Sequence, residues 1–291
     1  MPELPEVETT RRDLDARLRG RTILAVCFDS TGVTPARGLG PVEMADALRG
    51  RRIERLSRRG KYLIAHLDGG DALVLHRRMT GNLVLRRQSD PPEPYTRAVL
   101  TLDDGNELRW TDQRRFGTWM LTDTPEQAIP TIGPEPLEDG WLAEHLASAL
   151  ANRTAPIKAV LLDQRRVAGL GNIYADESLH LAGIHPERPA GTLTVEEVQR
   201  LHEAVRQVLE LAIQLQGSSA SSYVGGLGQR GSMQDEWRAY QRTGEPCRTC
   251  GTPIERIRVG GRGTHFCPQC QPSWSEAVRV NGGGGDGDAI A

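Results

Sequence analysis

Short runs rich in apolar residues recur over residues 1–132 of the chain, with polar residues between them. Gly, Asp and Pro separate these runs, which is the pattern of β-strands joined by turns. The runs lie at residues 21–28, 61–67, 72–76, 82–87, 97–102, 107–110 and 117–121. Their spacing predicts a β-sandwich or a β-barrel. Before them, residues 5–18 predict a short helix, because Pro5 suits a first helical turn and Glu6 and Glu8 suit its positive end.

Beyond residue 132 the apolar period changes from that of a strand to that of a helix. The segment 131–140 is rich in turn-forming residues and predicts a domain boundary. Helices are predicted at residues 141–150, 157–166, 173–182 and 194–215. We therefore expect an α+β chain with an N-terminal domain at 1–132, a helical domain at 133–232 and a cysteine-rich module at 233–271.

Two segments have the composition of chain without regular structure. Residues 217–232 are rich in Gly and Ser and predict a mobile loop. The Gly-rich stretch within 272–291 predicts a disordered tail.

Composition allows a globular protein of two domains, since 38% of the 291 residues are hydrophobic. No apolar run approaches the roughly 20 residues that span a bilayer, and the first residues do not form a secretory signal. We expect a cytoplasmic protein with no membrane partner. The net charge of −2 does not by itself indicate nucleic-acid binding. From Arg49 to Lys61, however, seven basic residues accompany only Glu54, so this run is either a phosphate-binding face or a solvated edge.

Four of the five cysteines fall into two closely spaced pairs near the C-terminus. These are Cys247, Cys250, Cys267 and Cys270. The spacing suits four thiolates around one structural Zn²⁺, with a redox dithiol as the alternative. Four protein ligands leave no open position, so such a metal performs no chemistry. The residues between the pairs alternate around a Gly-rich turn, which predicts a hairpin with Arg262 at its tip. Cys27 stands apart, and the pattern assigns it no role.

Six segments, taken in order, resemble the formamidopyrimidine-DNA glycosylase family. They are PELPEVE, SRRGKYL, HRRMTG, TDQRRFG, GLGNIYADESLHLAGIHP and the four-cysteine finger. The resemblance runs from Pro2 to Gln271 and implies a β-sandwich joined to a helical domain with a helix–two-turn–helix element and a zinc finger. It also implies a monomeric glycosylase and lyase that acts on 8-oxoguanine and formamidopyrimidines in duplex DNA, associated with the nucleoid when bound.

Excision of a base from a duplex requires the nucleotide to be flipped out of the stack. The resemblance implies that Pro2, once Met1 is removed, is the nucleophile. A secondary amine that attacks C1′ forms an iminium and divides a difficult hydrolysis into easier steps. Glu3 is implied as the proton donor to the sugar ring oxygen, and Glu6 as a supporting carboxylate. Without the resemblance, a proline at position 2 is an ordinary terminal residue.

Strand cleavage follows because the iminium acidifies the neighbouring sugar protons. The resemblance implies that Lys61 is the proton donor for β-elimination and Arg262 the donor for δ-elimination. Arginine has a very high pKa. We therefore expect Arg262 to hold a phosphate at least as much as it gives up a proton.

The family also fills the gap left by the flipped base and grips the backbone beside it. The gap-filling positions are Met79, Arg114 and Phe116, whose side chains suit an apolar wedge and a donor to the unpaired base. By the residues alone, Met79 and Phe116 could equally be strand-core residues. Further DNA contacts are implied for Tyr95, Arg153, Lys158 and Asn172. Tyr95 stands where many relatives have a histidine, and the Gly-x-Gly turn before Asn172 opens a helix that can support an anion.

Three other functions are compatible with part of the pattern. An endonuclease VIII-like enzyme for oxidised pyrimidines would share the Pro-Glu chemistry, but Leu4 and the gap-filling set favour the purine branch. A zinc-finger DNA-binding protein that has lost catalysis would bind the lesion tightly without a covalent intermediate, but no catalytic residue is missing from this chain. An RNA-associated zinc ribbon would leave the N-terminal motifs unexplained. Loop 217–232 has an unusual form for the family, so the preferred lesion and the preferred opposite base stay open.

Overall fold

The computed structural model describes residues 1–29, 34–35 and 39–273. The chain forms two compact units, and the division falls within one long helix. Unit 1 holds Met1–Glu135 and Leu209–Glu236, and unit 2 holds Pro136–Val208 and the chain from Trp237 onward. The domain limits at 132, 232 and 271 stay a prediction, and all but the first two residues of the predicted tail lie outside the described residues.

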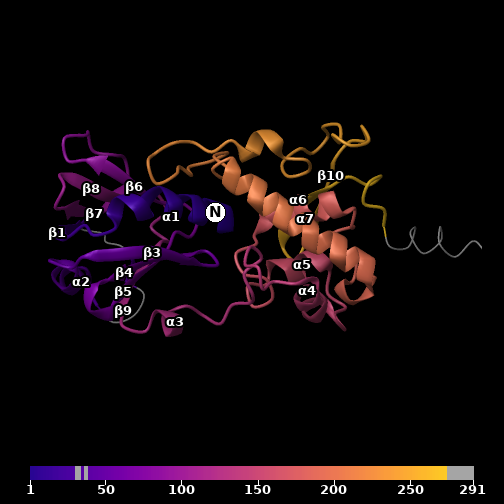
Figure 1. Ribbon diagram of the computed structural model, residues 1–291. Helices are drawn as coiled ribbons and strands as arrows, with labels where there is room; N and C mark the ends of the chain where they lie inside the picture. The colour runs from indigo at the N-terminus through magenta and orange to yellow at the C-terminus, as the bar shows by residue number, and fades with distance from the viewer. Residues whose placement is uncertain (30–33, 36–38, 274–291) are drawn as a thin grey trace, which may run out of the picture. The chain divides into compact units, whose positions relative to one another are not determined.

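Unit 1 is built on two separate sheets, so the sandwich is confirmed over the barrel (Figure 1). One sheet contains, in spatial order, β1 (Ile23–Phe28), β7 (Thr96–Leu102), β8 (Asn106–Asp112) and β6 (Gly81–Arg87), all antiparallel. The other contains β2 (Thr34–Pro35), β9 (Thr118–Thr122), β5 (Ala72–His76), β4 (Tyr62–Leu67) and β3 (Ile53–Arg59), antiparallel except for the β2–β9 pair. All seven predicted runs form strands.

The core of unit 1 lies between the sheets, where Leu, Val, Ile and Trp side chains from both are buried. Trp110 of β8 and Trp119 of β9 meet edge to face at 5.7 Å across it. The predicted N-terminal helix is α1 (Leu4–Leu18), and Val7, Leu14 and Leu18 join the same core. Three shorter helical segments were not predicted: α2 (Pro41–Leu48), the 3-10 turn η1 (Asp68–Gly70) and α3 (Pro125–Ala128).

Unit 2 is helical and carries the cysteine-rich module. Its regular elements are α4 (Ala143–Leu150), α5 (Ile157–Leu162), α6 (Asn172–Ala182), η2 (Ala190–Thr192), the first part of α7 (Val195–Gln214), β10 (Glu255–Val259) and β11 (Arg262–Phe266). The predicted helix 157–166 ends early, because the Asp163 carboxylate accepts the backbone N–H of Arg165 and starts a turn. Between α5 and α6 the chain forms a turn and a bend over residues 164–169.

The end of α7 and loop 217–232 belong to unit 1, followed by η3 (Met233–Glu236). Within the described chain, no helix is both long enough and apolar enough to cross a membrane.

Candidate active site and nucleic-acid interface

The first turn of α1 places an amine position beside two buried carboxylates. Pro2 is buried, and Glu3 and Glu6 are each only 2% exposed. Glu3 is the N-cap, and its N–H donates to Glu6 Oε2 at 2.8 Å, while its own carboxylate accepts the N–H of Glu6. This reciprocal pair is a capping box, which the first-turn position of Glu6 in the sequence already favoured. The local fold of α1 thus brings Pro2, Glu3 and Glu6 together.

Glu6 is held from a second direction by loop 217–232. The backbone N–H of Ser218 donates to Glu6 Oε1 at 2.9 Å. Gly217 has φ +79°, and a Cβ there would lie 3.0 Å from the Glu6 side chain and from the Tyr223 ring. Only glycine fits this backbone without strain. Each Glu6 oxygen therefore accepts a backbone N–H, which fits a fixed supporting carboxylate.

Lys61 lies in the turn from β3 to β4 and is 7% exposed. The arginines before it point to one buried carboxylate, Glu135. Arg58 Nη1 lies 2.6 Å from Glu135 Oε2, and Arg59 Nη1 lies 2.9 Å from Glu135 Oε1. The Gly60 N–H donates to the same carboxylate at 2.5 Å. Glu135 thus shapes the turn that carries Lys61, and nothing in the turn-rich segment 131–140 marked it out.

Three arginines of the basic run 49–61 pair with carboxylates inside unit 1, while Arg52 and Arg55 are exposed, so a phosphate-binding face stays a prediction for the rest of the run. Arg51 pairs with Asp68 at 3.0 Å and with Asp71 at 2.6 Å, and Arg58 also reaches Glu8 at 3.3 Å. Burial alone would raise the pKa of Glu8, but the guanidinium groups around it lower that pKa to about 2. Arg51, Arg58 and Arg59 are thus part of the internal charge pairing of the sandwich.

His76 closes the strand that leads to the predicted gap-filling residue Met79. Its ring meets Tyr62 edge to face at 4.6 Å, and its Nδ1 accepts the N–H of Arg78 at 3.2 Å. Burial, together with the charges of Arg78 and Lys61, lowers the pKa of His76 to about 3. His76 is therefore neutral at physiological pH.

The predicted gap-filling residues are exposed instead of lying in the core. Met79 is 38% exposed and Phe116 is 51% exposed, while Arg114 places its guanidinium 4.8 Å from the centre of the Phe116 ring. Asp112 organises their turn, because its carboxylate accepts the N–H groups of Arg114 at 3.2 Å and Gly117 at 2.8 Å. Exposed apolar side chains on ordered turns suit insertion into a kinked duplex.

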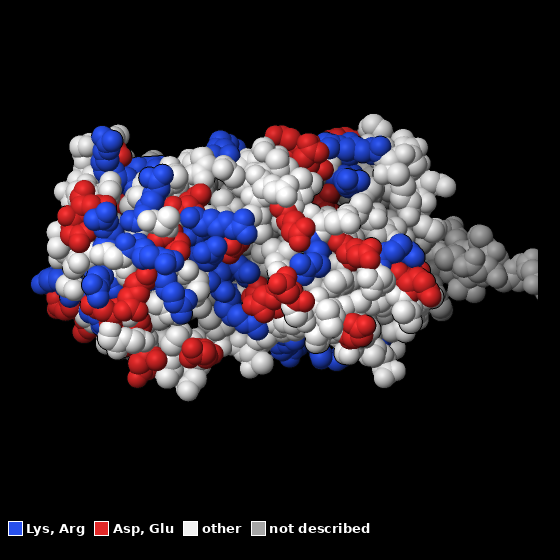
Figure 2. Space-filling view, in the orientation of Figure 1, with Lys and Arg blue, Asp and Glu red and all other residues white. Residues whose placement is uncertain are grey.

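Backbone strain and positive charge surround these turns. Arg78, Tyr95 and Arg115 have φ of +52°, +62° and +59°, an uncommon conformation for residues with a Cβ. Tyr95 is 53% exposed, and the Arg97 guanidinium lies 5.9 Å from its ring centre. Figure 2 shows Lys and Arg side chains gathered over the sandwich unit in this view, with carboxylates among them. The exposed Arg78, Arg114 and Arg115 add cations beside the gap-filling set.

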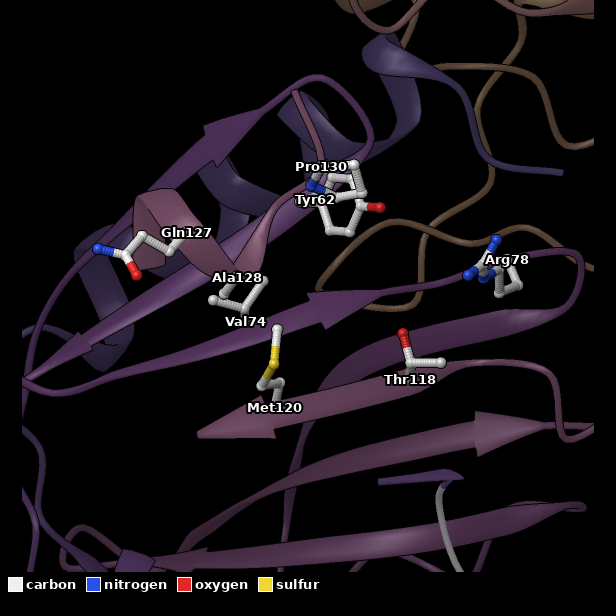
Figure 3. A pocket seen from close by; sticks show the side chains of 8 residues that line it. All are labelled: Tyr62, Val74, Arg78, Thr118, Met120, Gln127, Ala128 and Pro130. Carbon is white, nitrogen blue, oxygen red and sulfur yellow. The ribbon is translucent and has the colours of Figure 1, made fainter. Parts of the chain in front are cut away.

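A pocket of about 340 Å³ is hollowed into the five-stranded sheet beside Tyr62 and Arg78. Figure 3 shows Arg78 and Thr118 at one end of it and Gln127 at the other, with Val74 and Met120 between them. The pocket contains no carboxylate and no amine nucleophile, so we assign it no reaction.

In unit 2 the four cysteines form a closed metal site. Their sulfur atoms all lie within 4.8 Å of one another, with Cys247 to Cys270 at 3.9 Å and Cys250 to Cys267 at 3.4 Å. A tetrahedron of thiolates about Zn²⁺ has edges of about 3.8 Å. Backbone N–H groups and His180 Nε2, 3.3 Å from Cys247 Sγ, also approach the sulfurs. These residues hold one structural zinc ion.

The zinc module ends in the predicted hairpin, with Arg262 exposed at its tip. Gly260 and Gly261 form the turn at φ +55° and +78°, and Arg262 opens β11 opposite Val259. Glu177 of α6 secures the entry to the module. Its carboxylate accepts the N–H groups of Arg238, Ala239 and Tyr240 at 2.8–2.9 Å.

Lys158 and Asn172 lie directly behind this tip. Lys158 is 0% exposed, and its ammonium lies 2.6 Å from Asp176 and donates to Gly263 O at 3.1 Å and Thr264 Oγ1 at 2.8 Å. Asn172 Nδ2 donates to the same Gly263 carbonyl at 3.0 Å. The predicted phosphate contact of Lys158 does not fit this geometry, because the ammonium is fully enclosed. Of the three predicted backbone-binding residues in unit 2, Arg153 is the exposed one.

Family models match nearly the whole described chain. Residues 1–119 match the formamidopyrimidine-DNA glycosylase N-terminal domain, and residues 132–224 match its H2TH domain. Residues 244–272 match the zinc finger found in FPG and IleRS.

Full-length relatives agree with these matches. A formamidopyrimidine-DNA glycosylase of Chloroflexus aggregans is 49% identical over 275 residues, which cover 93% of this chain and 98% of the relative. The enzyme of the same name from Heliobacterium modesticaldum is 48% identical over 279 residues, covering 93% of this chain and 100% of the relative. The chain belongs to the formamidopyrimidine-DNA glycosylase family.

Solved structures of this family have the same fold. A Lactococcus lactis FPG mutant in complex with a Fapy-dG containing DNA has a TM-score of 0.85 and 40% identity, covering 94% of this chain and 100% of that one. A complex of the Lactococcus lactis Fpg with an abasic site containing DNA has the same TM-score and identity, with 93% and 100% covered. The α+β class, the N-terminal sandwich, the H2TH region and the zinc finger are confirmed.

Proposed function

We propose that this chain is a base-excision-repair glycosylase that removes oxidised purines, among them 8-oxoguanine and formamidopyrimidines, from double-stranded DNA and then cuts the strand. Its partner is damaged duplex DNA, which it binds as a monomer in the cytoplasm and nucleoid. The observation that carries the proposal is the buried group of Pro2, Glu3 and Glu6 at the start of α1, in a chain of this family.

In the excision step, the amine of Pro2 attacks C1′ after Met1 has been removed. The bond from C1′ to the base breaks, and the base leaves with the electron pair and takes up the proton that the Pro2 nitrogen releases. Glu3 donates a proton to the ring oxygen as the sugar opens, which leaves an iminium between Pro2 and C1′. Glu6 supports this step by fixing the N-cap of α1 through Glu3 N–H. The Glu6 carboxylate also stabilises the positive charge that develops at C1′ as the base departs.

In the lyase step, the iminium makes the C2′ proton acidic. Its loss expels the 3′ phosphate, and a second elimination expels the 5′ phosphate. Lys61, in the turn that Glu135 shapes, is the proton donor for the first elimination. Arg262 serves the second, mainly by holding phosphate from the tip of the zinc hairpin, because a guanidinium gives up its proton poorly.

The exposed Met79, Arg114 and Phe116 occupy the gap left by the flipped nucleotide, and Tyr95, Arg153 and Asn172 contact the backbone beside it. This set supports the purine branch over an endonuclease VIII-like enzyme for oxidised pyrimidines. Excision of 8-oxoguanine and of thymine glycol, compared under single turnover, distinguishes the two branches. Faster removal of thymine glycol would favour the pyrimidine enzyme.

Borohydride trapping on a duplex with one 8-oxoguanine tests the mechanism. Borohydride reduces the iminium to a stable amine, so the residue that carries the DNA can be located by mass spectrometry. The adduct is expected at Pro2, and blocking of the terminal amine should abolish it. A crosslink at Lys61, or a protein that retains Met1 and still forms the adduct, would overturn the assignment of the nucleophile. Lesion binding without any adduct would favour a DNA-binding protein that has lost catalysis.

A further inference from the structure

Arg77 is a buried arginine that the proposed chemistry does not use. It follows β5 in the HRRMTG motif, two residues before Met79, and only 1% of it is exposed. Removing a guanidinium from water is costly unless its N–H groups are paired. The hydrogen-bond partners of Arg77 therefore indicate its role in the fold.

The guanidinium connects three segments of unit 1. Towards its own turn, Nε donates to Gly81 O at 2.7 Å. Towards α1, Nη1 donates to Thr10 Oγ1 at 2.6 Å and approaches Glu6 O at 3.3 Å. Towards loop 217–232, Nη2 approaches Val224 O at 3.3 Å. These acceptors are all neutral, so Arg77 is held by geometry instead of by a salt bridge.

Two further side chains complete the contact with the loop. Tyr223 is 4% exposed and lies under the guanidinium, with its ring centre 5.0 Å from Arg77 Cζ. Asn82 Oδ1 accepts both Arg77 Nη2 at 2.6 Å and the N–H of Val224 at 3.2 Å, while its Nδ2 donates to Ser222 O at 2.8 Å. Arg77 and Asn82 together therefore fix residues 222–224 of the loop.

The far part of the loop has separate anchors. Asp13 Oδ2 of α1 accepts the N–H of Gly226 and Nε2 of Gln229, both at 2.8 Å. Leu85 N–H of β6 donates to Gly226 O at 2.8 Å. These contacts hold the loop in the described structure, and its mobility stays a prediction. The loop is fixed at both parts, and Arg77 controls the part nearer Glu6.

That part of the loop carries the N–H that binds the supporting carboxylate. Ser218 N donates to Glu6 Oε1, and the Tyr223 ring lies against Gly217, the residue just before Ser218. A change at Arg77 thus reaches Glu6 by two routes, through Tyr223 and Gly217 and through the Glu6 carbonyl itself.

We propose that Arg77 is a positioning residue for base excision, which holds loop 217–232 against α1 so that the Ser218 N–H stays on the Glu6 carboxylate. A planar fork of donors can reach three segments at once, and a lysine ammonium cannot. The inference rests on the proposed function. The proposal predicts different effects on base excision and on strand cleavage. Cleavage of a preformed abasic site involves no departing base, so it depends less on the contact between Ser218 and Glu6.

The test compares Arg77→Met and Arg77→Lys with Arg87→Met, a control at an exposed arginine at the end of β6. Single-turnover excision of 8-oxoguanine and cleavage of a preformed abasic site are measured in parallel, with hydrogen exchange of amides 218–231. Both Arg77 variants should lose about tenfold in excision, equivalent to one or two hydrogen bonds. Abasic-site cleavage should change less than about twofold, and the loop amides should lose protection, with Arg87→Met unchanged.

Equal losses in excision and abasic-site cleavage would mean that Arg77 is merely structural, and unchanged loop protection would also overturn the proposal. Arg77→Lys with full excision would refute the need for the fork. If thermal unfolding shows that Arg77→Met does not fold, Asn82→Leu removes the hydrogen bonds that join Ser222 and Val224 to the Arg77 guanidinium through Asn82, and the same readouts decide. A wild-type protein that excises no lesion would refute the proposed function itself, while loop protection would still decide whether Arg77 holds the loop.

Discussion

At the scale of single residues, the site depends on carboxylates whose oxygens are each assigned to a donor. Glu6 accepts the N–H of Glu3 on one oxygen and the N–H of Ser218 on the other. A buried acceptor that loses its partner costs free energy, and two donors forced to face each other cost more. The site should therefore be sensitive even to a substitution of Glu6 by a residue of the same shape.

Glu6→Gln tests this sensitivity. The new NH₂ group must face one of the two backbone N–H groups, so either the N-cap of α1 or the loop has to move. Excision of 8-oxoguanine should fall by about tenfold or more, which corresponds to about 1.4 kcal/mol or more in the barrier. Single-turnover kinetics measure the loss, with Glu54→Gln at an exposed position of β3 as the control. Equal excision rates for the two variants would show that Glu6 has no role in catalysis.

At the scale of elements, strands were predictable where short apolar runs lie between turn-forming residues, as in β4 and β5, or where buried and exposed positions alternate, as in β7. β3 was missed because only Ile53 and Leu56 of its residues are buried and most of the others are charged. The motifs located the candidate site, but its partners were not predictable. Glu135 binds arginines more than 70 residues away, and loop 217–232 binds α1 from more than 200 residues away. Patterns of neighbouring residues in the sequence do not predict contacts between residues so far apart in the chain.

The contact between α1 and β3 gives a pH prediction. The pKa of Glu8 is lowered to about 2 from 4.5, so its charged form stabilises the fold above about pH 4.5. This contribution is lost as the pH falls towards 2, and by linkage it amounts to on the order of 2–3 kcal/mol. Glu8→Gln should lower stability at pH 7 and flatten its dependence between pH 5 and about 2. Urea unfolding at several pH values measures this, and parallel curves for wild type and variant would contradict it.

The hairpin of unit 2 gives a second element-scale prediction, on Lys158. A lysine that touches phosphate contributes about 0.9 to the slope of log affinity against log salt. Lys158 is enclosed by Asp176, Gly263 and Thr264, so Lys158→Met should leave that slope unchanged and lower the stability of unit 2 by about 3 kcal/mol. Arg153 is exposed, so Arg153→Met should lower the salt slope and leave the stability of unit 2 unchanged. Binding to an abasic-site duplex at several salt concentrations measures both, and a lower slope for Lys158→Met would restore it as a phosphate contact.

At the scale of the whole molecule, the chemistry is divided between two compact units with different supports. Unit 1 holds the proposed nucleophile Pro2, the carboxylates of Glu3 and Glu6, and Lys61 on a sandwich with a large apolar core. In unit 2 the finger has only a small cluster around its cysteines, so the metal supplies much of the stability of the hairpin that carries Arg262. The two steps of strand cleavage should therefore differ in their dependence on zinc.

Removal of zinc tests this division. Chelation, or Cys250→Ser, should unfold the hairpin, lower DNA affinity by about tenfold to hundredfold and remove the δ-elimination product. Unit 1 should keep its β-sheet signal and its thermal transition, because its core contains none of the four ligands. Gel analysis of the cleaved ends separates β from β,δ products, and added zinc should restore both after chelation. Cys27→Ser, at the exposed cysteine of β1, is the matched control and should retain one zinc per chain. Full β,δ-elimination by the zinc-free protein would show that Arg262 does not need the metal to reach the sugar.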